Sequence, residues 1–163
     1  MGLYAPTPIQ AQAVPAAMQG ADVWATAPTG SGKTLAFALP LVQQHLLVPR
    51  QTNFRRPVRT LVLVPTRELA VQVGDVFTHL GYPHKLKVAV VYGGVSINPQ
   101  MMGLRGGADI VVATPGRLLD LVDHNAVHLQ DVQHLVLDEA DRLLDLGFAD
   151  ELQRVLALLP AQR

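Results

Sequence analysis

Two runs of residues carry groups that suit nucleoside triphosphate chemistry. The first run is Ala27-Pro28-Thr29-Gly30-Ser31-Gly32-Lys33-Thr34. The backbone N–H groups of a glycine-rich turn can wrap phosphate oxygens, the lysine can neutralise β/γ-phosphate charge, and the threonine hydroxyl can ligate Mg²⁺. The second run, Asp138-Glu139-Ala140-Asp141, follows the stretch His134-Leu135-Val136-Leu137. Carboxylates at the end of a strand supply oxygen ligands for a hard cation and a base for an attacking water. Together the two runs predict a site for a nucleotide and its magnesium.

The glycine-rich run departs from the strict G-x-x-x-x-G-K-[ST] pattern, because Ala27 stands where the first glycine belongs. Its surroundings nevertheless favour a phosphate loop over a structural turn. Residues 23–27 are predicted to form a strand, and residues 34–47 a helix whose N-terminus would face the phosphates. We expect Pro40 to kink this helix without ending the domain.

The acidic run has a simpler alternative, since acidic residues after a strand are often first-turn charges of the next helix. Asp141 fits that alternative, because a helix is predicted to start at Arg142. Asp138 and Glu139 fit it less well. In a hydrolase one of these carboxylates would hold Mg²⁺, and its neighbour would position and deprotonate the attacking water.

The elements that must position these groups alternate along the chain. Apolar β-type runs occur at 23–27, 60–64, 86–91, 110–113 and 135–137, and helical patterns at 34–47, 67–80, 99–104 and 116–122. This alternation predicts an α/β fold with a mostly parallel sheet covered by helices on both faces. Ligands of such sheets bind beyond the carboxyl ends of the strands. With 163 residues and no visible interior boundary, the chain is predicted to be a single domain over 1–163.

Composition narrows the function classes. The chain has no cysteine, which excludes disulfides, zinc–thiolate sites and cysteine nucleophiles. We see neither a signal-peptide pattern nor an apolar stretch long enough to span a bilayer, so we expect a cytoplasmic protein without a membrane partner.

The charges are unevenly placed along the sequence. Residues 50–117 carry nine Lys and Arg against three acids, a net +6, whereas residues 118–163 carry three Arg against nine acids, a net −6. This division suggests a polyanion-binding middle and a cation-binding end, although ordinary solvated surface is the alternative.

Near the N-terminus, Pro6-Thr7-Pro8-Ile9-Gln10 reads as a capping box. Thr7 would be the N-cap, Pro8 the first helical residue and Gln10 the third, at the start of a helix over 9–18.

Taken in order, the motifs show a family resemblance. They are Pro6–Gln10, Ala27–Thr34, Pro65-Thr66-Arg67-Glu68-Leu69-Ala70, Gly93-Gly94, Thr114-Pro115-Gly116-Arg117 and Asp138–Asp141. This series resembles the first, RecA-like core domain of DEAD-box RNA helicases and covers almost the whole chain. The stretch Tyr92–Gln100 is similar to their bacterial RhlE-type branch.

The resemblance implies a role for each matching residue. ATP or ADP would be bound by Tyr4, Thr7, Gln10, Thr29, Gly30, Ser31, Gly32, Lys33 and Thr34, with Gln10 on the adenine edge. Lys33, Asp138 and Glu139 would be catalytic, with Thr34 and Asp138 at the Mg²⁺. The RNA sugar-phosphate backbone would be held by Pro65, Thr66, Arg67, Gly94, Thr114, Gly116 and Arg117. Asp141 would couple the site to the second RecA-like domain. Read without the family, Arg67 and Arg117 would be surface ion-pair residues.

The sequence departs from the family in two respects. Only nine residues precede Gln10, so the family's usual upstream aromatic partner for adenine is missing. The sequence also ends at Arg163, before the Ser-Ala-Thr motif and the second core domain, which supplies the arginine fingers. We therefore expect a monomeric fragment of an RNA helicase that binds nucleotide but hydrolyses it negligibly.

Two other functions stay open at this point. One is a DNA translocase or another P-loop NTPase. The motifs Pro6–Gln10 and Pro65–Ala70 argue against it. The other is a non-catalytic nucleotide-binding or scaffold module.

Overall fold

The structure, a computed structural model, describes residues 5–49 and 55–161. The chain divides into two compact units, Met1–Arg50 and Gln51–Arg163. The single domain over 1–163 stays a prediction. Across the described ranges, no helix combines the length and the apolar character that crossing a membrane requires.

The first unit contains two helices that pack against each other, α1 (Pro8–Met18) and α2 (Lys33–Leu47). Thr7 is the N-cap of α1 and Pro8 its first residue, as the capping-box pattern predicts. Helix α2 continues through Pro40 to Leu47, so this proline does not end the helix. Both predicted helices are therefore confirmed.

The strand predicted over residues 23–27 is wrong. These residues form no strand, and Trp24 is 90% exposed. A β-type sequence becomes a strand only when a neighbouring strand supplies ladder hydrogen bonds. Over its described residues this unit offers two helices and no such neighbour.

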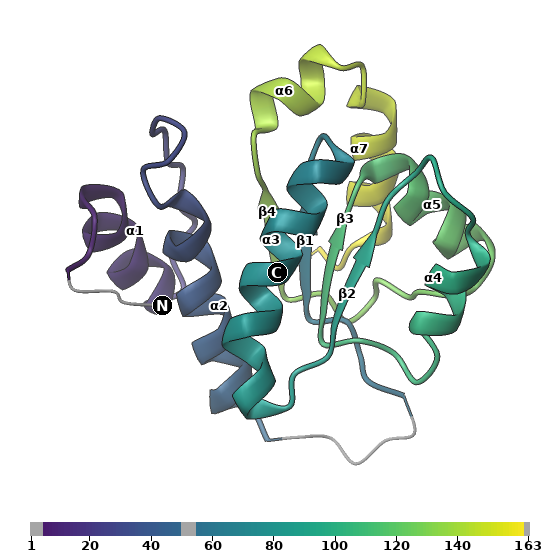
Figure 1. Ribbon diagram of the computed structural model, residues 1–163, viewed down its shortest axis with the longest axis horizontal. Coiled ribbons are helices and arrows are strands. Elements are labelled where there is room, and N and C mark those ends of the chain that lie inside the picture. The colour runs from purple at the N-terminus through teal and green to yellow at the C-terminus, as the bar shows by residue number, and fades with distance from the viewer. Residues whose placement is uncertain (1–4, 50–54, 162–163) are drawn as a thin grey trace. The chain divides into compact units, whose positions relative to one another are not determined.

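The second unit is built on a four-stranded parallel sheet in the order β2-β3-β1-β4 (Figure 1). The strands, which confirm four predicted runs, are β1 (Thr60–Leu63), β2 (Val88–Val91), β3 (Ile110–Ala113) and β4 (His134–Leu137). The helices are α3 (Arg67–Gly81), the 3₁₀ turn η1 (Tyr82–His84), α4 (Asn98–Gly103), α5 (Pro115–Asp123), α6 (Ala140–Asp145) and α7 (Ala149–Leu158). Helix α7 lies in a stretch for which we predicted no element.

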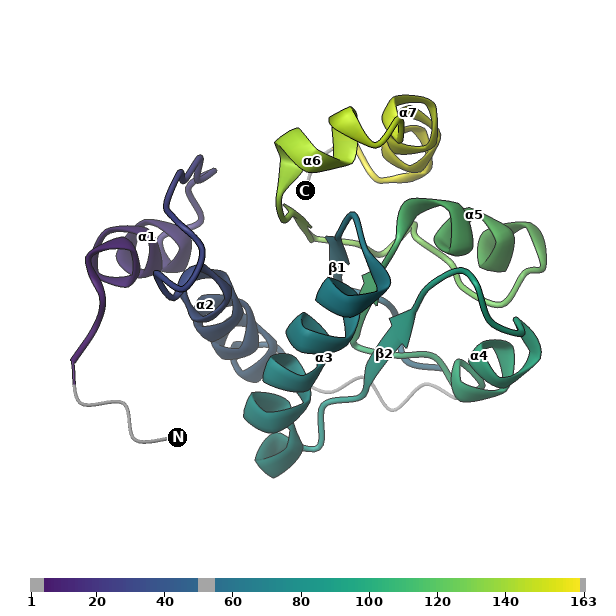
Figure 2. The ribbon, with the colours of Figure 1, turned by 45° about the horizontal axis from the view of Figure 1, so that its top comes forward.

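Helices cover both faces of this sheet (Figure 2). Leu61 and Leu63 of β1 belong to a buried cluster that includes Leu118 of α5 and Val155 of α7. Helix α3 packs on the opposite face, where a Cβ at Gly74 would come within 2.2 Å of Val90 Cγ2. The α/β fold with a parallel sheet between helices is thus confirmed.

The strand register brings the predicted motifs to one edge. Val91, Ala113, Leu63 and Leu137 form one row across the sheet. The residues that follow them continue the ladder: Thr114 N donates to Val91 O (3.1 Å), Val64 N to Ala113 O (3.0 Å) and Asp138 N to Leu63 O (3.0 Å). The Pro65, Thr114 and Asp138 motifs therefore begin together at the carboxyl ends of the strands.

His134, the first residue of β4, should make the stability of the fold depend on pH. Burial lowers the pKa of His134 below its ordinary value. At a pH between the folded and the unfolded pKa of His134, the unfolded chain binds more protons at this residue than the folded chain does. The contribution of His134 to the free energy of unfolding is therefore complete above about pH 6.5, and it is lost as the pH falls through the folded pKa. We expect His134→Gln to flatten the fall in urea midpoint between about pH 7.5 and about pH 5.5. An unchanged fall would contradict this role.

Candidate functional site

The glycine-rich loop of the first unit has the groups that a phosphate needs. Gly30 and Gly32 take the left-handed backbone conformation, with φ of 80° and 88°, and Ser31 N donates to Pro28 O at 3.2 Å. Helix α2 begins directly after this loop, at Lys33, whose Nζ donates to Ala27 O at 2.6 Å. Ser31 Oγ is buried without a hydrogen-bond partner. A lysine held across the loop, an unsatisfied hydroxyl and a helix N-terminus together fit a phosphate group.

Gln10 contacts this loop directly. Its Nε2 donates to Gly32 O at 3.2 Å, its Oε1 accepts from Thr7 N at 3.0 Å, and the residue is only 8% exposed. These two bonds fix which end of the amide is oxygen and which is nitrogen. One N–H and one lone pair remain for a further partner. The structure therefore brings Thr7, Gln10 and Gly32 together, as their shared assignment to the nucleotide requires.

The other predicted nucleotide residues are less constrained. Thr29 is exposed, while Thr34 lies half-buried in the first turn of α2. Tyr4 lies outside the described residues.

In the second unit, the acidic run forms the turn from β4 into α6. Glu139 is the N-cap of α6 and has a φ of 52°, a left-handed conformation that non-glycine residues seldom adopt. Its Oε2 pairs with Arg142 Nη1 at 3.2 Å. Asp141 Oδ1 accepts from Arg142 N at 2.9 Å, so Asp141 also fits its simpler description as a first-turn charge. A strained backbone at a charged residue is a feature of functional sites.

Within the described ranges, the structure holds no cluster of three or more His, Asp or Glu residues that could bind a metal ion. A magnesium ion would therefore need the phosphate oxygens of a nucleotide among its ligands, which is its usual mode of binding.

Thr66 and Arg67 start helix α3 at the carboxyl edge of the sheet. Thr66 is the N-cap, and its Oγ1 accepts from Leu69 N at 3.3 Å. The Arg67 guanidinium lies 5.1 Å from the centroid of the Tyr92 ring, which follows β2. Among the described residues, the structure shows this cation–π contact for Arg67 and no ion pair.

Arg117 of α5 is the most unusual of the predicted RNA-binding residues. Its side chain is only 10% exposed, and its Nη2 donates to Val95 O at 2.8 Å. Nε lies 3.7 Å from Asp120 Oδ2, yet Nε and Nη1 are both buried without a hydrogen-bond partner. The contact with Asp120 is the ion pair of the simpler interpretation, and the two buried donors that lack a hydrogen bond suit an additional anionic ligand.

The remaining predicted RNA-binding residues lie at the same edge of the sheet as this arginine. Gly94 precedes Val95 and has a φ of 78°, and a Cβ at Gly94 or Gly116 would meet no atom within 4 Å. Thr114 is the buried N-cap of α5. The structure thus brings Pro65–Arg67, Gly94, Thr114, Gly116 and Arg117 to one edge of the second unit.

Sequence reasoning missed the clamp that holds Tyr92. Gln100 Oε1 accepts from Tyr92 N at 3.1 Å, and Gln100 Nε2 donates to Tyr92 O at 3.0 Å. The pair fixes the backbone that carries the ring beneath Arg67. A glutamine eight residues after a tyrosine is too weak a sequence signal to predict this contact.

Comparisons with known proteins agree with these observations. The family model described as DEAD/DEAH box helicase matches residues 7–163. The chain is 44% identical to the probable ATP-dependent RNA helicase ddx27 of Dictyostelium discoideum and 47% identical to the ATP-dependent rRNA helicase rrp3 of Sclerotinia sclerotiorum. Both alignments cover 100% of this chain but only 21% and 33% of those proteins, so the chain spans a fifth to a third of their length.

Solved structures show the same likeness. A hypothetical ATP-dependent RNA helicase from Sulfolobus tokodaii matches 97% of this chain, and 44% of its own, with a TM-score of 0.84 and 38% identity. The yeast DEAD-box splicing factor Prp28 matches 97% of this chain, and 37% of its own, with a TM-score of 0.87 and 34% identity. The fold is therefore that of a RecA-like helicase domain, and the chain belongs to the DEAD/DEAH box helicase family.

Proposed function

We propose that this chain is the ATP- and RNA-binding N-terminal core domain of a DEAD-box RNA helicase. The whole protein would couple ATP hydrolysis to the local unwinding of RNA duplexes. The observation that supports RNA binding most strongly is the buried Arg117 guanidinium, which has two unsatisfied donors beside the Gly94–Val95 backbone. An RNA phosphate supplies the oxygen acceptors that these donors lack.

The first unit would bind the nucleotide. Gln10 would offer its remaining N–H to adenine N7 and its remaining lone pair to the N6 amino group. Residues 29–32 would wrap the phosphates with backbone N–H groups, and Lys33 would neutralise their charge.

The acidic run would serve the chemical step. Mg²⁺ bound to the phosphates would neutralise charge that develops during phosphoryl transfer. Thr34 and Asp138 would hold it, Glu139 would orient and deprotonate the attacking water, and Asp141 would couple the site to a second RecA-like domain.

The carboxyl edge of the second unit would hold RNA through its backbone, because Thr66, Arg67 and Arg117 offer donors suited to phosphate. Such contacts carry no base sequence.

A comparison of RNA and DNA as activators tests this function in the full-length protein. We expect RNA, and not DNA of the same sequence, to stimulate ATP hydrolysis. Equal stimulation by both would favour a DNA translocase or another P-loop NTPase. Nucleotide binding without any hydrolysis would favour a non-catalytic module.

A place in the RhlE-type branch depends on Tyr92–Gln100 alone, and the eukaryotic relatives named above give it no support. A monomeric state and a cytoplasmic location stay predictions from the sequence.

Replacing Gln10 by Ala should weaken adenine nucleotides selectively. The loss in binding free energy should be about 1–3 kcal/mol, the cost of removing buried hydrogen bonds. It should be selective for adenine, because guanine presents an acceptor where adenine has its N6 donor. Calorimetric titration with ADP and GDP would measure it. The substitution also removes the bonds to Thr7 N and Gly32 O, so melting curves must show that the variant is folded. Equal affinity of the unmodified chain for ADP and GDP would refute the adenine-reading role.

RNA binding at the carboxyl edge should be weak and sensitive to salt. We expect about two to three phosphate contacts there, each contributing about −0.7 to the slope of log affinity against log salt. Arg67→Ala or Arg117→Ala should each reduce the slope by about one contact, whatever the RNA sequence. Fluorescence anisotropy at several salt concentrations would measure this. Strong sequence preference or insensitivity to salt would contradict it.

A further inference from the structure

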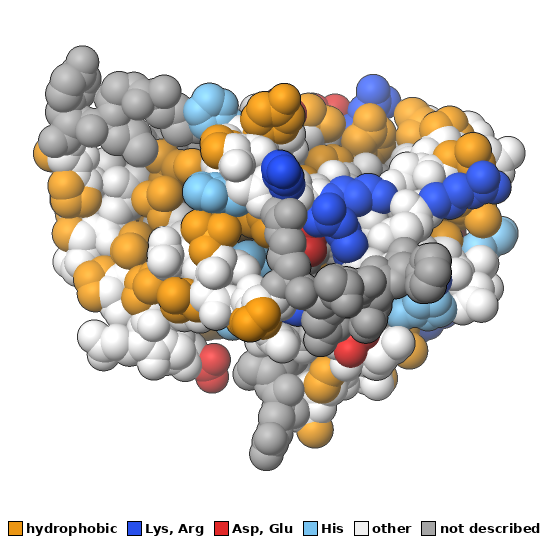
Figure 3. Space-filling view, turned by 90° about the horizontal axis from the view of Figure 1, so that it is seen from below, with side chains coloured by type: hydrophobic (Ala, Val, Ile, Leu, Met, Phe, Trp, Pro, Cys, Tyr) orange, Lys and Arg blue, Asp and Glu red, His pale blue; other side chains and the backbone are white. Residues whose placement is uncertain are grey.

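A second group of cations lies at the amino ends of the strands, the opposite end of the sheet from Arg67 and Arg117. Asp109 N donates to Lys87 O at 2.9 Å and Arg59 N to Asp109 O at 3.1 Å, so the chain enters β2, β3 and β1 along one row. We call Arg56, Lys85, Lys87 and Arg105 the basic row. Figure 3 shows Lys and Arg side chains gathered on this face.

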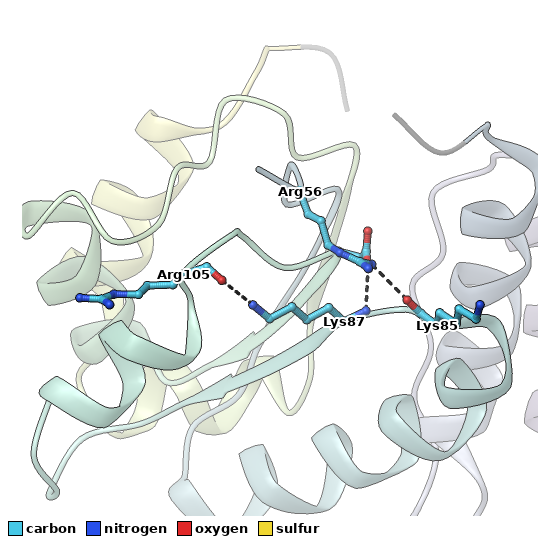
Figure 4. Close-up of polar contacts among 5 residues, drawn as sticks. Arg56, Lys85, Lys87 and Arg105 are labelled. Carbon is cyan, nitrogen blue, oxygen red and sulfur yellow. Dashed lines mark hydrogen bonds and ion pairs between the residues drawn. The ribbon is translucent and has the colours of Figure 1, made fainter. Parts of the chain in front are cut away.

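The contacts within the basic row hold the side chains of Arg56 and Lys87, and only Arg56 is paired with a carboxylate (Figure 4). Arg56 Nη1 donates to Asp109 Oδ2 at 2.6 Å and to Lys85 O at 3.1 Å. Lys87 Nζ donates to Arg105 O at 2.8 Å. Two of these three acceptors are backbone carbonyls, and Asp109 is the one carboxylate among them. Four cations against one carboxylate give the cluster a net charge of +3.

Two members of the basic row lie in unfavourable surroundings, and at Lys87 a bound anion would offset the cost. Lys85 has a φ of 56°, a left-handed conformation for which glycine or asparagine would be better suited. Burial lowers the pKa of Lys87, the Arg56 charge lowers it further, and Asp109 acts in the opposite direction. The charges of Arg56 and Lys87 therefore oppose each other, which a bound anion would relieve.

An exposed aromatic ring stands next to the basic row. Tyr82 of η1 is 80% exposed, and its backbone oxygen accepts from Lys85 N at 3.0 Å. Cations that hold phosphates, combined with an aromatic face on which a base can stack, are the means by which proteins bind single-stranded nucleic acid. An acidic peptide would match the charge but would not need the exposed ring.

We propose that the basic row and Tyr82 form a second RNA-binding surface, which holds the sugar-phosphate backbone of a single strand and stacks one base on Tyr82. This surface goes beyond the proposed function, whose RNA contacts lie at the carboxyl ends of the strands. Lys87 precedes β2 and Tyr92 follows it. At about 3.3 Å per residue, the two surfaces lie about 16 Å apart along that strand.

The test measures the binding of a labelled oligouridylate of about ten nucleotides to the 163-residue chain by fluorescence anisotropy. The double variant Lys85→Ala/Arg105→Ala removes two exposed side chains whose contacts described above use only backbone oxygens. Two lost contacts should lower the salt slope by about 1.4, which weakens binding about 25-fold at about 0.1 M salt. Tyr82→Ala should weaken binding at least about fivefold, whereas Tyr82→Phe should not.

Controls separate this surface from a general effect of charge or stability. Arg154→Ala removes an exposed arginine of α7 and should leave RNA binding unchanged. Lys85→Arg/Arg105→Lys should keep the affinity of the unmodified chain, and melting curves should be alike for all variants.

The outcomes distinguish this inference from the proposed function. Weaker binding in the basic-row variants but not in Arg117→Ala would support the second surface and refute the carboxyl-edge grip. Weaker binding in Arg117→Ala alone would support the carboxyl-edge grip and refute the second surface. If a polyglutamate peptide of similar length binds, and the basic-row variants abolish its binding but not that of RNA, the surface serves an acidic protein segment and the inference is overturned.

Discussion

Residues 1–163 alone should hydrolyse ATP at close to the background rate, and the protein that includes the second core domain should be faster by about 10³–10⁵-fold, or about 4–7 kcal/mol of barrier. In the proposed mechanism the chain would contribute a phosphate loop, a lysine and two carboxylates. It contains no motif that resembles the family's arginine fingers. A positioned arginine that stabilises transition-state charge on the transferring phosphoryl group accounts for a rate effect of that size.

The arginine nearest the acidic run does not replace such a finger. Arg142 Nη1 pairs with Glu139 Oε2 at 3.2 Å, so its charge lies on the proposed base and not on a phosphate. Its side chain is 55% exposed, and an ion pair of this kind contributes little to stability. Glu139→Gln should therefore leave the fold intact.

The measurement compares steady-state ATP turnover, with and without RNA, for the 163-residue chain and the two-domain protein. RNA should stimulate only the longer protein. Glu139→Gln in that protein should abolish hydrolysis while calorimetry shows nucleotide binding largely retained. If the short chain turns over ATP as fast as the two-domain protein, the division of the site between two domains is refuted.

Local signals explain why much of the second unit could be predicted. Residues 60–63 and 110–113 are fully buried in the sheet, and their continuous apolar runs predict that environment. Thr66 and Thr114 are the N-caps of helices that were predicted from residues 67 and 116, and Pro115 follows Thr114 at the first helical residue. Parallel strands place the motifs that follow them at one edge of the sheet. Motifs that each come directly after a predicted strand therefore indicated a common site.

Features that depend on pairing across space could not be predicted in this way. Residues 23–27 have a strand-like composition but no partner strand within their unit, and composition does not report on partners. The left-handed Glu139, the Gln100 clamp on Tyr92 and the stacking of Arg67 on that ring depend on which loops meet after folding. The charge excess of residues 50–117 is likewise divided by the fold between two ends of the sheet. Helix α7 is different, since Leu152, Val155 and Leu159 are buried at helical spacing and did offer a local signal.

Gly32→Ala should weaken ADP binding more than any other single change in the phosphate loop. Gly32 has a φ of 88°, and a Cβ there would lie 2.4 Å from Gln10 Nε2 and 3.1 Å from Thr7 Oγ1. The left-handed conformation costs a residue with a side chain about 1–3 kcal/mol. Displacing the Gln10 amide from Gly32 O removes a further bond of about 0.5–1.5 kcal/mol. The loop should relax away from its phosphate-wrapping conformation, which weakens ADP by about 2–4 kcal/mol, or about 30- to 1,000-fold.

Two other glycines of the first unit allow the effect of backbone strain to be measured apart from the effect of a Cβ contact with Gln10. Gly30 and Gly20 also have positive φ, 80° and 79°, but a Cβ at either would meet no atom within 4 Å. Gly30→Ala should therefore weaken ADP by the strain contribution alone, and Gly20→Ala, outside the loop, should leave ADP affinity unchanged. Calorimetric titration measures the ADP affinity of each variant, and urea unfolding measures its free energy of unfolding. Equal losses for Gly32→Ala and Gly30→Ala would show that the contact between Gln10 and the loop contributes nothing to nucleotide binding. ADP affinity should fall more in Gly32→Ala than in Gly30→Ala, and this extra loss should shrink when Gln10 is also replaced by Ala. That result would show that the contact between Gln10 and Gly32 couples the binding of the base to the binding of the phosphates.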